Sequence, residues 1–151
     1  MIISNLKAVK RDWQKATNSV DTRARRTRDE MMTALIQLSK EEIQGKRGSH
    51  KGPNGGRVWD KATAGQPPMN RTGDLRRSIT GKKYKAGFGT YSAIVGPTII
   101  YGRSVEVGGQ YAPPSWRGTS AMRGFPYMEP AYKKFRTQVF QQIVRKNFGR
   151  G

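Results

Sequence analysis

Residues 2–44 read IISNLKAVKRDWQKATNSVDTRARRTRDEMMTALIQLSKEEIQ, and this segment dictates the architecture. Its apolar residues recur every three or four positions, which is the spacing of one face of an α-helix. The pattern predicts a long amphipathic helix that ends at Gly45, because glycine suits the position after a helix. The poor helix formers at 17–19 also allow a kink, with Ser19 or Asp21 capping a second helix. The apolar positions are Ile2, Leu6, Val9, Trp13, Ala16, Val20, Ala24, Met31, Leu35, Leu38 and Ile43.

The length of this apolar stripe bears on assembly. A chain of 151 residues that is rich in loops has too little remaining structure to cover the stripe from end to end. We therefore expect part of the helix to pack on a neighbouring subunit.

Two segments rich in glycine and proline interrupt the chain. Residues 45–71, GKRGSHKGPNGGRVWDKATAGQPPMNR, show almost no periodicity and predict a long basic loop or arm. Residues 110–125 predict a second loop. The first loop has two interpretations: a solvated insertion, or an arm that orders on a partner with Val58 and Trp59 as its anchor. The whole chain, 1–151, is predicted as a single α+β domain.

Residues 72–79, TGDLRRSI, predict a short helix. Thr72 or Asp74 can cap it, Gly73 permits a tight turn, and Leu75 and Ile79 lie on the same side. The exposed side then carries the two arginines of this segment.

Strand-like residues and a last helix follow. Residues 82–88, 91–95 and 99–107 predict a small antiparallel sheet, the third strand because its residues alternate. From residue 127 apolar residues again recur at helical spacing. Pro126 and Pro130 stand near the start of that helix, where proline is tolerated. The fold class is α+β, with a long N-terminal amphipathic helix, a long basic loop, a short helix, a small antiparallel sheet and a C-terminal helix.

Composition excludes several classes of function. The chain has no cysteine, so disulfides, thiolate metal sites and cysteine nucleophiles are ruled out. No apolar run approaches the length of a membrane span, and lysines and arginines interrupt the first residues where a signal peptide is apolar. The single histidine, His50, has no carboxylate neighbour in sequence. We expect a protein made in a cytoplasm that is not an enzyme and that binds no cofactor or metal.

Charge is the strongest compositional signal. Lysine and arginine number 29 against 10 acidic residues, a formal net charge of +19. Three interpretations stay open: a solvated basic surface, contact with DNA phosphates, and docking onto acidic proteins. No helix-turn-helix, zinc-finger or RNP-type motif is present. The candidate contact residues are Lys46, Arg47, Lys51, Arg57, Trp59, Lys61, Arg76, Arg77 and Trp116.

Three segments, in this order along the chain, carry a resemblance to a known family. They are PPMNRTGDLRRSI at 67–79, IIYGRSVEVGG at 99–109 and RGFPYMEPA at 123–131. After an amphipathic N-terminal helix, this succession resembles the tail-completion or head–tail joining proteins of long-tailed bacteriophages, which are neck or minor tail components. The chain departs from the family pattern at Gly102 and Arg103 and by an insertion at 110–124.

The resemblance implies a structural virion protein of the neck. By family expectation it forms a homo-oligomeric ring, a hexamer, that joins the head connector to the tail tube and lets double-stranded DNA pass through its lumen. The implied partners are further copies of the chain, connector or stopper proteins, and tail terminator or tube proteins. Two alternatives remain: a nonspecific nucleic-acid-binding protein, and a tail-terminator or head-stopper subunit of the neighbouring ring. Within the motifs, Glu106 is expected to pair with Arg76, Arg77 or Arg103.

Overall fold

The fold is seen in a computed structural model, which describes residues 2–43, 49–51, 54–55, 57–59, 68, 73–85, 89–108 and 124–149. Helices and two short antiparallel strand pairs make up these residues, so the predicted α+β class is confirmed. In chain order the elements are α1 (Ile2–Glu42), β1 (Ser49–Lys51), β2 (Arg57–Trp59), α2 (Asp74–Ser78), β3 (Ile79–Lys85), β4 (Tyr91–Pro97), α3 (Gly102–Val107), α4 (Met128–Lys134), the π-helical turn η4 (Phe135–Val139) and α5 (Phe140–Phe148).

Helix α1 is continuous over all 41 of its residues. No second helix starts at Ser19 or Asp21, which the sequence allowed. The threonine hydroxyls in this stretch bond inside the helix: Thr17 donates to the Trp13 carbonyl at 2.9 Å, and Thr22 to the Asn18 carbonyl at 2.8 Å. These bonds let polar residues of low helix propensity sit mid-helix. The helix ends at Glu42, and the expected end at Gly45 lies outside the described residues.

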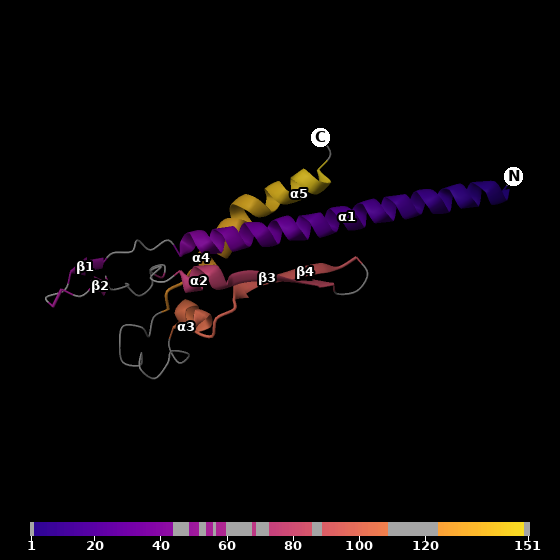
Figure 1. Cartoon of the computed structure of the whole chain (residues 1–151). Coiled ribbons are helices and arrows are strands. Elements are labelled where there is room, and N and C mark those ends of the chain that lie inside the picture. The colour runs from indigo at the N-terminus through magenta and orange to yellow at the C-terminus, as the bar shows by residue number, and fades with distance from the viewer. Residues whose placement is uncertain are drawn as a thin grey trace.

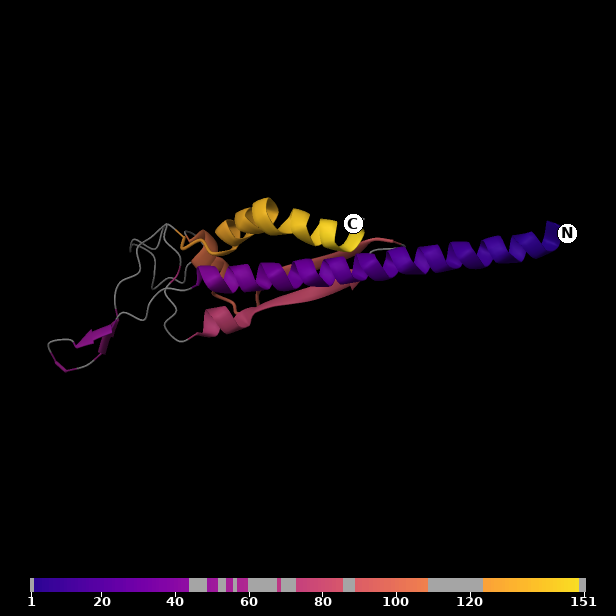
Figure 2. The ribbon, with the colours of Figure 1, turned by 90° about the horizontal axis from the view of Figure 1, so that it is seen from above.

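Among the described elements, the β3–β4 hairpin and the C-terminal helices pack against one half of α1 (Figure 1). The β3–β4 hairpin runs along one side of the helix, and the C-terminal helices α4 and α5 return along another side (Figure 1). The N-terminal part of α1 extends beyond both, as the view from above also shows (Figure 2). The molecule is therefore a three-layer body with a single projecting helix.

The two strands of the larger hairpin are longer than expected at one end each. They pair antiparallel, with Ile79 opposite Pro97 and Lys85 opposite Tyr91. Gly81 lies where β3 meets α1, and a Cβ there would come within 2.5 Å of the Met32 sulfur. Glycine thus lets the sheet approach the helix closely.

Part of the predicted basic loop is a second hairpin. Ser49 pairs with Trp59, His50 with Val58, and Lys51 with Arg57. The prediction of a featureless loop across 45–71 is wrong at these positions. Gly55 in the turn has a φ of 72°, a conformation that glycine adopts at little cost. The Asn54–Gly55 pair was the available hairpin signal, but strands of three residues are too short to show a period.

The predicted third strand at 99–107 is also wrong, because residues 102–107 form helix α3. The first turn closes when the Val105 amide donates to the Tyr101 carbonyl at 2.9 Å. Gly102 and Val105, the buried pair, stand three residues apart, which is a helical spacing. Gly102 fits against Pro97, where a Cβ would lie 2.4 Å from the ring. Packing at this glycine favours a chain reversal over a further strand.

The last helix begins after Tyr127, as predicted, with Pro130 in its first turn. It is regular except for the π-helical turn η4. Glu106 serves this helix, because its carboxylate accepts the backbone N–H groups of Tyr127, Met128 and Glu129 at 2.7, 2.9 and 3.0 Å. These donors have no partner within the helix. The expected pairing of Glu106 with an arginine is replaced by this cap.

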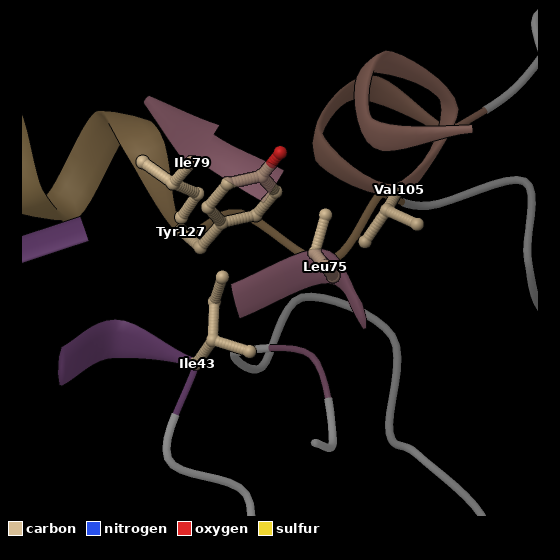
Figure 3. Close-up of a cluster of buried hydrophobic side chains, with 5 residues drawn as sticks. All are labelled: Ile43, Leu75, Ile79, Val105 and Tyr127. Carbon is tan, nitrogen blue, oxygen red and sulfur yellow. The ribbon is translucent and has the colours of Figure 1, made fainter. Parts of the chain in front are cut away.

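The buried core lies where α1 ends. Figure 3 shows side chains from α1, α2, β3, α3 and the start of α4 converging there. The phenol of Tyr127, fully buried, donates to the Gly102 carbonyl at 3.1 Å. Burial, followed by the charge of Glu106, raises the pKa of that phenol. The cluster consists of Ile43, Leu75, Ile79, Val105 and Tyr127.

The short helix α2 follows a glycine turn. Gly73 has a φ of 80° and is the N-cap, so Asp74 does not fill the predicted capping position. Thr72 lies outside the described residues. Asp74 instead pairs with Arg77 at 2.5 Å. Leu75 and Ile79 are both buried, which confirms that they point to the same side.

Candidate functional site

The N-terminal half of α1 carries four exposed large apolar side chains among the described residues. Trp13 is 71% exposed, although tryptophan is one of the residues that gains most from burial. Leu6, Val9 and Val20 are also more than half exposed and lie on the same face. Contiguous apolar surface of this kind marks an interaction site. The described residues of this face thus place several large apolar side chains in water.

The remaining half of the same helix is fastened to the body by polar contacts. Glu30 accepts hydrogen bonds from Asn147 and Lys146 of α5 at 3.0 and 3.1 Å, and from Arg26 at 3.0 Å. The bonds from Asn147, Arg26 and Lys146 lower the pKa of Glu30 to about 2. On the sheet side, Asp29 accepts from Lys83 at 2.8 Å, a bond that lowers the pKa of Asp29.

The dense basic run at 23–28 is largely engaged inside the molecule. Arg25 pairs with Asp21 at 2.7 Å, and Arg28 pairs with Asp29 at 2.8 Å. Both guanidinium groups lie over the ring of Tyr91, 5.4 and 5.5 Å from its centroid. Cation–π contacts of this kind hold α1 against β4. Much of the positive charge that the sequence offers for binding phosphate here stabilises the fold.

The predicted contact residues are distributed over two elements and the undescribed segments. Arg76 and Arg77 are exposed on α2, as expected, although Arg77 is engaged by Asp74. Lys51 and Arg57 are register partners in the β1–β2 hairpin, and Trp59 ends the same pair of strands. Lys46, Arg47, Lys61 and Trp116 lie outside the described residues.

An open groove runs between α1, β4 and the C-terminal helix. Its volume is about 370 Å³, and its walls are mainly apolar. Among the described residues that line it, no base stands beside a nucleophile. Within the described part of the chain, no three His, Asp or Glu side chains gather in a way that could hold a metal ion. The groove is lined by Met31, Met32, Leu35, Tyr91, Phe135 and Phe148, among others.

Comparison of the chain with protein-family models, with curated proteins and with solved structures finds no match. Among the described helices, none combines the length and apolar character that crossing a bilayer requires.

Sequence reasoning missed two features of these surfaces. The capping role of Glu106 depends on residues about twenty positions further on, and no local pattern announces it. For α1, the sequence predicted that part of the helix packs on a neighbouring subunit, but it did not predict which half is left uncovered. The sequence did carry one signal of that division: Arg23 interrupts the apolar stripe three residues after Val20.

Proposed function

We propose that this chain is a structural subunit that self-associates into a ring in the neck of a long-tailed bacteriophage. The ring joins the DNA-filled head, through its connector, to the tail tube, and DNA passes through its lumen. Such a joint needs no catalysis. It requires an interface between copies, together with further surfaces for the connector or stopper on one side and the tail terminator or tube on the other.

The observation that carries this proposal is the projecting half of α1. Burying one large apolar side chain contributes roughly 1.5–3 kcal/mol. In the isolated chain much of this stabilisation is missing on the projecting half, because four of its large apolar side chains are more than half exposed: Leu6, Val9, Trp13 and Val20. A subunit that completes its own core but leaves such a stripe in water is suited to assembly.

Packing of the three family-like segments supports the resemblance on which the neck assignment rests. Leu75 and Ile79 come from the first segment, Val105 from the second and Tyr127 from the third, and they share one buried cluster. The Phe125 amide also donates to the Val105 carbonyl at 2.6 Å. Segments far apart in sequence therefore act as one structural unit, which is what a shared family signature requires.

Charge supports a lumen that conducts DNA. The formal net charge is +19, and Arg76 is exposed on α2, away from the ion pairs of α1. The same charge favours the second candidate, a nonspecific nucleic-acid-binding protein. That candidate predicts DNA affinity of the isolated protein that falls steeply with salt. The neck proposal requires no tight binding by the isolated subunit.

The decisive test is electron microscopy of lysates from a phage with a nonsense mutation in this gene. We expect DNA-filled heads beside separate tails of normal length, and joined particles again when the wild-type gene is supplied in trans. Intact particles from the mutant would contradict the neck assignment and favour the nucleic-acid-binding candidate. Empty heads would assign the chain to the head-stopper ring, and overlong tails to the tail-terminator ring.

A further inference from the structure

The uncovered residues of α1 follow a stricter pattern than amphipathicity requires. Their spacing alternates between three and four, which is the heptad repeat abcdefg of coiled coils with apolar residues at a and d. Val20 ends the repeat, because the next d position is Arg23. In this notation Leu6, Trp13 and Val20 occupy position a, and Val9 and Ala16 occupy position d, with Ile2 at d by sequence.

The end of the repeat coincides with the start of the body. Ala24 lines the groove on the chain's own body, and Thr27 is the first buried side chain of the helix, at 7% exposure. From there on, the body covers the apolar face. The heptad segment, residues 2–20, is about 28 Å long at the rise of an α-helix. A helix of this length is only marginally stable alone in water, so a partner packed along its apolar face would explain why the segment is helical.

From these observations we propose that the segment 2–20 of α1, the heptad arm, associates with the same segment of further copies as a parallel, in-register coiled coil. This inference deepens the proposed ring function and rests on its premise that the chain self-associates. In a ring, such pairing joins neighbouring subunits away from the ring axis, which leaves the lumen open for DNA.

Charges beside the seam favour the parallel arrangement over the antiparallel one. The antiparallel register that buries all six apolar positions sets Leu6 against Ala16 and Val9 against Trp13. It also brings the two Asp12 side chains together at position g, and the two Lys10 side chains together at position e. Like charges at these flanking positions disfavour a pairing.

The parallel register avoids this repulsion. Position g then faces position e of the next heptad, which pairs Asn5 with Lys10 and Asp12 with Thr17. No like charges meet along this seam. The layers also alternate in size, because the bulky Trp13 layer is followed by the small Ala16 layer, as a packed core requires.

The absence of cysteine makes disulfide trapping a clean test, because any introduced thiol is unique. In the parallel register Ala16 of each copy meets its counterpart, within the short Cα–Cα reach of a disulfide. We expect full-length Ala16→Cys to form covalent pairs under mild oxidation. Asn18→Cys, at position f on the outer face, is the matched control and should stay unlinked.

Other trapping results would overturn the parallel seam. Linking of a Leu6→Cys, Ala16→Cys double variant without linking of Ala16→Cys alone would indicate antiparallel pairing. A protein that is oligomeric by sedimentation but unlinked at Ala16→Cys would show that copies meet through another surface, and the ring function would stand. A protein that is monomeric at every concentration would overturn the seam outright.

A charge placed in the seam gives an independent measurement. Trp13→Asp should weaken self-association by about 100-fold or more, whereas Gln14→Asp, with the same charge change at the outer position b, should leave it nearly unchanged. Both sites are exposed in the single chain, so thermal unfolding of the body should be unaltered. Equal association of the two variants would overturn the seam. Loss of association in Trp13→Asp, combined with intact particles from the nonsense mutant, would keep the seam and reject the neck function.

Discussion

The two halves of α1 have the same amphipathic pattern but differ in how much of their apolar face is buried. Apolar residues recur at helical spacing in both, yet Trp13 is 71% exposed while Ile43, directly after the second half, is completely buried. The second half packs between the β3–β4 hairpin and the C-terminal helices, and the first half extends past them (Figure 2). Periodicity therefore determines which face of a helix seeks cover, and the rest of the fold determines whether the chain itself supplies that cover.

Polar contacts sharpen the contrast. On the covered half, Glu30 accepts a hydrogen bond from Lys146 of α5, and Asp29 accepts one from Lys83 of β3. On the projecting half, the described residues form an ion pair between Arg11 and Asp12, which are neighbours in sequence and lie 3.9 Å apart. Such exposed local pairs contribute little to stability. The covered half is part of the domain, and the projecting half depends on what it meets.

The largest difference between the halves should appear in stability. Tyr127→Ala, which empties the core beside the end of α1, should lower the free energy of unfolding by about 3–5 kcal/mol. Leu6→Ala on the projecting half should change it by less than about 0.5 kcal/mol. Urea unfolding at concentrations where the protein is monomeric measures both. A large loss from Leu6→Ala under those conditions would mean that the projecting half packs on its own body.

A smaller effect is expected where the sheet touches the covered half. Gly81→Ala should cost about 1–3 kcal/mol, because its Cβ would meet the Met32 side chain at 2.5 Å. Gly96→Ala in the partner strand is the matched control, since a Cβ there meets nothing within 4 Å. Thermal unfolding compares the two variants. Equal stability would show that β3 does not lie tightly on α1.

The smallest effect should be a pH-dependent loosening of α5. The pKa of Glu30 is lowered from 4.5 to about 2, so its carboxylate stabilises the contact at pH values above 4.5, and the contribution is lost as the pH falls toward 2. Hydrogen exchange of α5 amides should rise over this interval in the wild-type protein. Glu30→Gln should remove most of the pH dependence. Glu129→Gln, whose partner Lys133 lies on the same helix, should retain it; equal behaviour of the two variants would contradict the assignment.

Local patterns predicted much of the fold correctly. The long helix, the short helix at Leu75, strands β3 and β4 and the last helix all follow from periodicity and from turn residues. Residues 99–107 show where this reasoning fails, because alternating residues there form helix α3. Val107 is 57% exposed and Ile100 is 99% exposed, so the apparent alternation of the segment does not sort its side chains between core and water. The close fit of Gly102 against Pro97 and near Tyr127 is nonlocal, and no window of sequence contains it.

The candidate site divides in the same way. The sequence anticipated an uncovered apolar stripe and exposed arginines at 76 and 77. The sequence also has a dense basic run at 23–28, and there Arg25 and Arg28 lie over the ring of Tyr91. Whether a charge is available to a partner depends on its neighbours in space, and those come from β4, far along the chain.

By itself, the sequence determined helices α1 and α2, the C-terminal helix, the apolar faces, the excess of positive charge and the heptad spacing of residues 2–20, since each of these depends on neighbours within a few positions. Only the tertiary structure decided where the body stops along α1, that Glu106 caps α4, and which basic residues remain exposed. These outcomes depend on contacts between residues tens of positions apart. Such contacts form because burying Tyr127 and its neighbours together lowers the free energy more than any local preference of the segments that carry them.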